Sequence, residues 1–287
     1  MIIFISPIFI EKKGKLPGKN IVVMTGVHGN ESFGVDAIKE LIPSLDVKKG
    51  KITFIIANPE AVKQNKRFIE FNLNRCFLKL QPKDIYDSLE GKIARKLILY
   101  MENADWLLDI HGSNSQDSTP FIICEKQSFD VAKKLPFGII SYNWDKFQPG
   151  SSDYYMNTQN KIGICAECGY IGKKDSKEEA KRAITNFLIL ADSIEGKIKT
   201  IPNKKFLKIV SQYKNKYGKF IKSRNFNDFE GLDKNEQIGK DGIKKVYAKN
   251  GEIVLFVRDR ENLGEECFLI AEETLLNSKK LYKLLRE

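Results

Sequence analysis

The sequence predicts an α/β fold in which a mixed, mostly parallel central sheet is covered by helices on both faces. Apolar, β-branched runs at 21–25 and 52–57 are typical of buried strands. Segments with helical spacing, at 32–41 and 88–100, alternate with these runs. Because continuous apolar strands separated by helices build parallel sheets, active residues are expected in loops at the carboxyl ends of the strands.

Further elements follow the same reasoning. Strands are expected at 1–10, 106–110, 120–124 and 162–168, and an amphipathic helix at 176–194 with Ser176 as its N-cap. After residue 196 the pattern changes to short alternating segments that are broken by glycines. We therefore expect two domains, a larger α/β domain at 1–196 and a small β-rich domain at 197–287.

Composition limits the class of protein. With 287 residues, of which 42% are hydrophobic and 30% charged, the chain is expected to be soluble and globular rather than disordered or membrane-spanning. The apolar run at 1–10 is too short to cross a bilayer and lacks the features of a signal peptide. Five cysteines in apolar contexts suit reduced, buried thiols. These observations predict a cytoplasmic protein with no membrane partner.

The net charge of +11 favours anionic partners, which include acidic small molecules, nucleic acid and anionic membrane surfaces. The segment 201–227 contains no acidic residue and alternates lysines with aromatic side chains, as single-strand-binding grooves do. The same alternation arises in a β-hairpin with buried aromatic rings and solvated lysines. We favour the hairpin and keep nucleic-acid binding through 201–227 as a remote alternative.

The chain has only two histidines, and each directly follows a predicted strand. His28 is followed at i+3 by Glu31, a spacing that allows both side chains to reach one ion. His111 supplies a third ligand and leaves a fourth position for water, as in catalytic zinc sites. Asp109 is placed to orient a ligand imidazole. The alternative is that each histidine is an ordinary hydrogen-bonded loop residue.

Glu167 ends an otherwise apolar strand, where burial without a partner is costly for a carboxylate. A raised pKa would suit a general base and acid, and the alternative is a buried ion pair with a lysine. Cys165 and Cys168 form a C-x-x-C pattern, which we interpret as core thiols. Arginines in 58–75 suit carboxylate recognition and oxyanion stabilisation, although such segments are often solvated loops.

Taken together, these motifs resemble the succinylglutamate desuccinylases and aspartoacylases, which share the zinc carboxypeptidase fold. The matching stretches occur in the family's order and are GVHGNE (26–31), NPEAVKQNKRFIEFNLNR (58–75), DIHGS (109–113) and AECG (166–169). The segments 241–256 and 264–270 resemble the family's small β-domain more weakly.

The resemblance implies one Zn²⁺ per chain, bound by His28, Glu31 and His111. It also implies that Arg67 polarises the scissile carbonyl and that Glu167 moves the proton. Asn74 and Arg75 would hold a carboxylate of the substrate. The implied function is a zinc-dependent amidohydrolase that acts on a small, anionic N-acyl amino acid, at a carbon–nitrogen bond other than a peptide bond.

Two positions depart from the aspartoacylases proper. This chain has Asn72 where they carry the aspartate of D-L-N-R, and Asn157 where they carry an additional substrate-binding arginine. The stretch 150–155 resembles instead the G-S-x-D-aromatic segment of carboxypeptidases and deacylase-like proteins. A zinc carboxypeptidase is therefore the main alternative, but a second domain that narrows the pocket favours a deacylase. The acyl group, the amine and the oligomeric state are not specified by the sequence.

Overall fold

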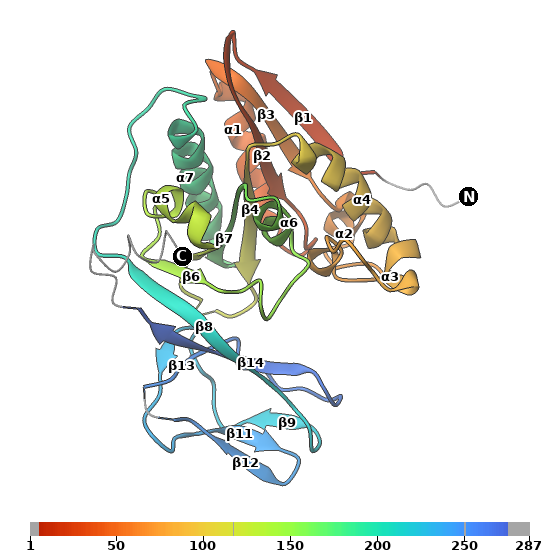
Figure 1. Cartoon of the computed structure of the whole chain (residues 1–287), viewed down its shortest axis with the longest axis vertical. Coiled ribbons are helices and arrows are strands. Elements are labelled where there is room, and N and C mark those ends of the chain that lie inside the picture. Colours follow the sequence, from red (N-terminus) through yellow and green to blue (C-terminus); the bar gives the residue numbers. More distant parts are fainter. Residues whose placement is uncertain (1–5, 117, 250, 275–287) are drawn as a thin grey trace.

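A computed structural model describes residues 6–116, 118–249 and 251–274. Within them, a mixed eleven-stranded sheet has the order β1-β3-β2-β4-β7-β5-β6-β8-β14-β13-β10, and a three-stranded sheet has the order β12-β11-β9 (Figure 1). The strands are β1 (Ile8–Lys13), β2 (Leu16–Thr25), β3 (Lys49–Ile56), β4 (Trp106–Ser113), β5 (Phe121–Cys124), β6 (Ile139–Tyr142), β7 (Ile162–Tyr170), β8 (Lys205–Lys214), β9 (Phe220–Lys222), β10 (Glu230–Gly231), β11 (Gln237–Asp241), β12 (Lys244–Tyr247), β13 (Ile253–Leu255) and β14 (Glu266–Glu273).

Helices cover both faces of the sheet. They are α1 (Phe33–Leu41), α2 (Pro59–Lys63), α3 (Lys83–Asp87), α4 (Leu89–Glu102), α5 (Phe129–Ala132), α6 (Ser152–Thr158) and α7 (Lys174–Leu190), with short 3₁₀ turns η1 (Ile42–Ser44), η2 (Leu73–Arg75) and η3 (Lys126–Ser128). Along β2, Ile21 and Val23 pack on the α1 and α7 side, whereas Val22 and Met24 pack on the α4 side. This alternation, which follows from the period of two in a strand, gives the sheet two hydrophobic layers.

The predicted fold class is confirmed. Strands β3, β2, β4 and β7 are parallel neighbours, while β1 and β5 join this core antiparallel. Consequently the carboxyl ends of β2, β4 and β7 meet at one edge of the sheet.

Two element boundaries differ from the sequence prediction. The first strand begins at Ile8, and residues 1–5 of the predicted strand lie outside the described residues. Helix α7 begins at Lys174 with Lys173 as its N-cap, so the prediction that Ser176 caps it is wrong. The Ser176 hydroxyl donates instead to the carbonyl of Tyr170 at 2.6 Å, which ties the helix to the end of β7.

The region beyond residue 197 is β-rich, and its strands β8, β14, β13 and β10 extend the central sheet, while β9, β11 and β12 form the separate small sheet (Figure 1). Strand β8 pairs in parallel with β6 and antiparallel with β14. Strand β9 pairs with β11 rather than with β8, so the hairpin that we expected within 201–227 is wrong. The division into domains at 1–196 and 197–287 stays a prediction.

The five cysteines are free and buried, as the sequence predicted. In the described part of the chain, no helix is both long enough and apolar enough to cross a bilayer. A cytoplasmic location stays a prediction.

Candidate metal centre and its cavity

Three side chains converge at the carboxyl edge of the sheet. His28 and Glu31 lie between β2 and α1, and His111 lies near the end of β4. Each of the three offers a ligand atom within 4.8 Å of the others, and each side chain is almost fully buried. The Nδ1 atoms of His28 and His111 lie 2.8 and 3.0 Å from the two carboxylate oxygens of Glu31. The two nitrogens therefore face one common point beside the carboxylate.

The outer nitrogen of each histidine faces an oxygen atom. His28 Nε2 lies 2.9 Å from Asn72 Oδ1 in hydrogen-bonding geometry, whereas His111 Nε2 lies 3.1 Å from Asp109 Oδ2 at an ion-pair distance without a hydrogen bond. A proton on His28 Nε2 bonds to Asn72 and leaves the Nδ1 lone pair of His28 free for a metal. Ser152 donates in turn to Asp109, which fixes the carboxylate behind His111. This donor set fits a divalent ion that prefers nitrogen and oxygen ligands, such as Zn²⁺.

Electrostatics in the cluster are strongly coupled. Burial alone would raise the pKa of Glu31, but the neighbouring His28 and His111 lower it well below its usual value. Burial lowers the pKa of His28. Burial opposes protonation of His111, yet the carboxylates of Asp109 and Glu31 raise its pKa well above the usual range. The carboxylates of Glu31 and Asp109 thus favour a positive charge at this point of the cluster.

A close backbone approach fixes the first of these loops. A Cβ on Gly29 would lie 2.0 Å from the backbone carbon of Ala61, so only glycine fits against α2 here. The Gly29 amide donates to the carbonyl of Arg67 at 3.3 Å, which joins the His28 loop to the arginine-bearing loop. These contacts explain why the glycine of the GVHGNE stretch is needed beside the histidine.

The cluster opens into a cavity of about 510 Å³, called the site cavity below. Its walls come from three loops of the central sheet and from the C-terminal strands. Residues predicted for the site that line it are His28, Glu31, Arg67, Asn74, Arg75 and Glu167, and the C-terminal region adds Phe256, Arg258, Arg260, Glu265 and Glu266. The structure therefore brings every predicted site residue to the cavity except His111 and Asp109, which lie directly behind it.

Glu167 lies on β7 directly opposite His111 in the sheet register. Burial raises the pKa of Glu167 to about 7, with a further rise from Glu31, while His111 and Arg67 oppose the shift. A carboxyl group with this pKa can accept and return a proton near neutral pH. Arg67 approaches the cluster more loosely, because its Nη1 lies 3.5 Å from Glu31 Oε1.

Arg75 is held by neutral partners. Its guanidinium donates to the carbonyl of Asn74 at 2.6 Å and to Gln148 Oε1 at 2.5 Å. Gln148 donates through Nε2 to both carboxylate oxygens of Glu266, at 2.9 and 2.7 Å. Gln148 therefore links the predicted carboxylate-binding arginine to strand β14.

Asn157 does not take the place of the arginine found in aspartoacylases. Its amide donates to Asp145 Oδ2 at 3.1 Å, and its carbonyl oxygen accepts from Gln127 at 2.8 Å. It is not among the residues that line the site cavity. Asp153, one turn earlier on α6, lines the cavity instead.

Sequence reasoning missed Glu90, which holds the arginine-bearing loop. This fully buried side chain on α4 accepts from the backbone amides of Ile69, Glu70 and Phe71 at 2.7, 3.2 and 3.1 Å. It also accepts from Asn58 Nδ2 at 3.1 Å. A glutamate in the first turn of a helix is common because it interacts favourably with the helix dipole. The sequence around Glu90 therefore gave no sign that its side chain binds a distant loop.

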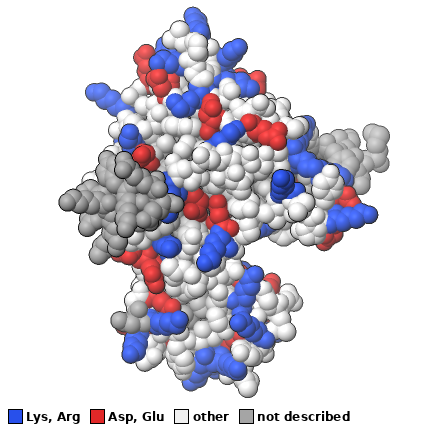
Figure 2. Space-filling view, viewed as in Figure 1, with Lys and Arg blue, Asp and Glu red and all other residues white. Residues whose placement is uncertain are grey.

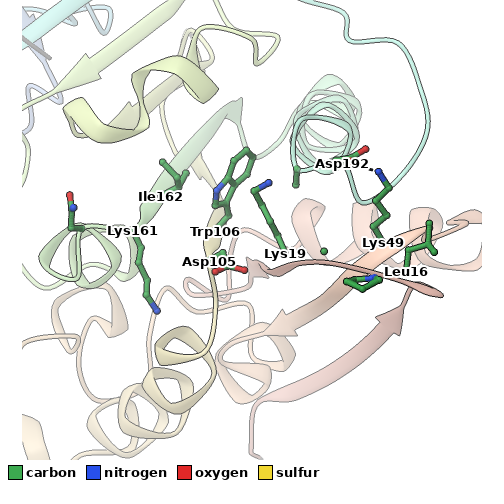
Figure 3. Close-up of a pocket in the computed structure, with 12 residues that line it drawn as sticks. Leu16, Lys19, Lys49, Asp105, Trp106, Lys161, Ile162 and Asp192 are labelled. Carbon is green, nitrogen blue, oxygen red and sulfur yellow. Dashed lines mark hydrogen bonds and ion pairs between the residues drawn. The ribbon is translucent and has the colours of Figure 1, made fainter.

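A larger hollow of about 830 Å³ lies at the opposite, amino end of the parallel strands (Figure 3). Its lysines are engaged: Lys49 pairs with Asp192 at 2.5 Å, Lys161 donates to the carbonyl of Glu102 at 2.7 Å, and Lys19 lies over the ring of Trp106. Among the described residues, this hollow has no cluster of histidine and carboxylate side chains like the one at the site cavity.

Comparisons with known proteins point to one family. The sequence model of the family described as "Succinylglutamate desuccinylase/Aspartoacylase catalytic domain" matches residues 17–191. The chain is 30% identical over 169 residues to a probable aspartoacylase from Acaryochloris marina, covering 53% of this chain and 56% of that protein. It is 25% identical over 285 residues to a succinylglutamate desuccinylase from Vibrio vulnificus, covering 89% and 81%. The chain thus spans little more than half the length of the first relative.

Solved structures show the same fold. A succinylglutamate desuccinylase from Vibrio parahaemolyticus superposes with a TM-score of 0.76 at 20% identity, covering 92% of this chain and 86% of that chain. A succinylglutamate desuccinylase/aspartoacylase from Rhodobacter sphaeroides superposes with a TM-score of 0.72 at 18% identity, covering 93% and 88%.

The contacts of Glu90 yield a first prediction. Glu90→Ala should lower the free energy of unfolding by about 3 kcal/mol, because buried backbone amides lose their acceptor. Glu90→Gln should cost less, since one acceptor oxygen remains. Urea unfolding followed by circular dichroism measures both, with the exposed Glu102→Gln on the same helix as the matched control. Equal stability of all these variants and the wild type would show that Glu90 does not hold the loop.

Proposed function

Because the chain belongs to the succinylglutamate desuccinylase/aspartoacylase family, we propose that it is a zinc-dependent hydrolase that cleaves the amide bond of a small N-acyl amino acid. The observation that carries this proposal is the buried cluster of His28, Glu31 and His111, which faces the same cavity as Glu167 and Arg67. Metal ligands, a proton acceptor with a raised pKa and a hydrogen-bond donor for an oxyanion are the groups that amide hydrolysis requires.

His28 and His111 through Nδ1, together with the Glu31 carboxylate, would hold one Zn²⁺ per chain. When bound, Zn²⁺ supplies positive charge that polarises a carbonyl and makes water a stronger acid. Asn72 keeps His28 in the tautomer that presents Nδ1 to the ion, and the Asp109 carboxylate lies beside the outer nitrogen of His111. The ligand set includes no cysteine, which fits a catalytic rather than a structural site.

The other groups act on the substrate and on protons. Glu167 accepts a proton from the attacking water and returns it to the leaving amine, for which a pKa of about 7 is suited. Arg67 donates to the oxyanion that forms on the scissile carbonyl. Arg75 binds a carboxylate of the substrate, and Gln148 holds its guanidinium in place. Asn74, beside Arg75 in the cavity wall, contributes its amide to the same carboxylate.

The C-terminal strands support a deacylase over a carboxypeptidase. Phe256, Arg258 and Glu266 form one wall of the site cavity, and its volume of about 510 Å³ suits a small conjugate. A carboxypeptidase needs an open groove in which the rest of the peptide can lie. If the protein removes the C-terminal residue of peptides faster than it hydrolyses N-acyl amino acids, the deacylase proposal is wrong.

Nucleic-acid binding through 201–227 receives less support. Phe206 and Phe220 are buried, and Tyr213 stacks on Phe268 with ring centroids 4.9 Å apart. These rings are therefore unavailable to stack on bases. On the face drawn in Figure 2, basic side chains are interspersed with acidic ones and do not line one continuous groove.

The metal proposal makes a second prediction. Wild-type protein should contain one zinc per chain, and His28→Ala, Glu31→Ala and His111→Ala should each lose it, because each removes one of three ligands. Mass spectrometry of the metal content checks this, with the exposed Glu40→Ala as the control that keeps the metal. Folded wild-type protein with no stoichiometric metal, after exposure to zinc, would refute the proposed site.

A third prediction separates chemistry from binding. Glu167→Gln should lower kcat by about a hundredfold or more while retaining zinc, because proton transfer is lost. Arg75→Ala should mainly raise KM, by about tenfold, because a charged hydrogen-bond donor to the substrate carboxylate is removed. Release of free amine from N-acetyl and N-succinyl amino acids measures both. A kcat of Glu167→Gln close to that of the wild type would contradict the mechanism. The control is Arg182→Ala, which removes an arginine from a surface ion pair and should leave both kinetic constants unchanged.

A further inference from the structure

The three-stranded sheet of β9, β11 and β12 has one packed face and one exposed face. On the packed face, Phe220 and Ile238 belong to a hydrophobic cluster and are almost fully buried. On the other face, the register places Ile221, Lys240 and Lys245 opposite one another in one row, and all three are exposed. This sheet lies at the end of the molecule away from the helices (Figure 1).

The exposed face is strongly basic. We call it the tip face and define it by Lys219, Ile221, Lys240, Ile243, Lys245 and Tyr247. Strands β9, β11 and β12 contain one acidic residue, Asp241, and its side chain is buried. Glu261 from a neighbouring loop pairs with Lys219, whereas Lys240 and Lys245 form no ion pair with any described residue. At this end of the molecule, Figure 2 shows mainly basic side chains among the charged ones.

Apolar side chains lie among these lysines. Ile243 is 97% exposed, the largest fraction for any large hydrophobic residue in the described part of the chain, and Ile221 is 59% exposed. Ile243 follows Gly242 in the two-residue turn between β11 and β12. With φ at 58°, the first turn position favours glycine, but the turn does not require an apolar residue at the second position. Ile243 therefore gains hydrophobic free energy only when a partner removes it from water.

The hairpin that carries Ile243 is held in a fixed position. The Asp241 carboxylate accepts from the backbone amides of Lys216 and Tyr217 at 2.8 and 2.9 Å. The Gly242 amide donates to the carbonyl of Lys219 at 2.9 Å. These hydrogen bonds join the turn to the loop between β8 and β9. The tip face is therefore arranged before a partner binds, which lowers the entropic cost of binding.

We propose that the tip face binds the surface of a bilayer that contains anionic phospholipids. The lysines lie among the negatively charged headgroups, and Ile243 enters the boundary between headgroups and acyl chains. Tyr247 suits the same boundary, because its ring is apolar and its hydroxyl is polar. The sequence predicted no membrane partner because no segment could span a bilayer, but binding at the surface requires no such segment. This inference is independent of the proposed hydrolase activity.

Two other occupants fit the tip face less well. Single-stranded nucleic acid needs free ring faces for stacking, and Lys244 Nζ covers the ring of Tyr217 beside this face, 3.6 Å from the ring centroid. An exposed isoleucine adds nothing to base stacking. A second copy of the chain would bring lysines against lysines, which repel. An anionic bilayer surface accommodates both the lysines and Ile243.

The test is co-sedimentation of the whole chain with lipid vesicles. The protein should bind vesicles of phosphatidylcholine mixed with phosphatidylserine, but not vesicles of phosphatidylcholine alone. Raising the ionic strength from about 0.1 M to about 1 M should weaken binding about tenfold or more, because the Debye length falls from about 10 Å to about 3 Å. No binding to the anionic vesicles, or equal binding to both kinds of vesicle, would overturn the inference.

Variants then assign the binding to the tip face. The double variant Lys240→Gln with Lys245→Gln should lower the vesicle partition coefficient about thirtyfold, because each lysine near an anionic surface contributes a factor of about five. Ile243→Ser should lower the partition coefficient about tenfold, because the apolar contact with the acyl chains is lost.

Matched controls make the same chemical changes elsewhere. The double variant Lys205→Gln with Lys208→Gln removes two exposed lysines of β8, and Leu80→Ser replaces a leucine that is 87% exposed. These controls should bind anionic vesicles as the wild type does, and circular dichroism checks that every variant folds. If the tip-face variants bind as tightly as the wild type, or the controls weaken binding as much as they do, the inference is wrong.

Two further measurements address the other occupants. The same variants are used in gel mobility of a single-stranded oligonucleotide and in sedimentation velocity of the protein alone. Oligonucleotide binding without vesicle binding, lost when Lys240 and Lys245 are replaced, would overturn the inference in favour of nucleic acid. Self-association without vesicle binding, lost in Ile243→Ser, would overturn it in favour of a second copy of the chain.

Discussion

The burial of one carboxylate organises the candidate site. Glu31 has only 2% of its side chain exposed, and it lies between the Nδ1 atoms of His28 and His111. A buried charge of this kind requires partners on every side, and those partners come from loops that are distant in sequence. The amide of Gly112 donates to the same carboxylate at 3.1 Å, so the end of β4 is fixed by it as well. The loops after β2 and β4 therefore form one unit around Glu31.

The parallel sheet makes this convergence possible. Strands β2, β4 and β7 are adjacent and run in the same direction, so residues near their carboxyl ends are brought together without long loops. The register places His111 opposite Glu167, which sets the Glu167 carboxyl group beside the cluster of His28, Glu31 and His111. Besides the parallel sheet, Glu90 supports the site. Its carboxylate accepts from backbone amides of the irregular loop that carries Arg67, which have no backbone acceptors there. The strand order therefore sets the positions of His28 and His111, and Glu90 holds the loop that carries Arg67.

These two supports explain what could be predicted from the sequence. The positions of His28 and His111 follow from local signals, because a strand, a loop and a helix can each be recognised in the chain and the fold class then sets which edge they share. The contacts of Glu90 and Gln148 join segments that are far apart in sequence, and no local pattern encodes them. The error at Ser176 has the same origin. A serine before a helical pattern predicts a cap, but the hydroxyl bonds instead to Tyr170, whose position depends on the sheet.

The C-terminal wall of the cavity is rigidly connected to the rest of the site. Strand β8 pairs with β6 of the central sheet and with β14, and β13 pairs with β14. The Glu266 carboxylate on β14 accepts from Gln148, which also holds Arg75. Displacing this wall would break ladder hydrogen bonds and the contact that orients Arg75. The position of Arg75 relative to this wall is therefore set before a ligand arrives, and the entropic cost of arranging the cavity is incurred during folding rather than during binding.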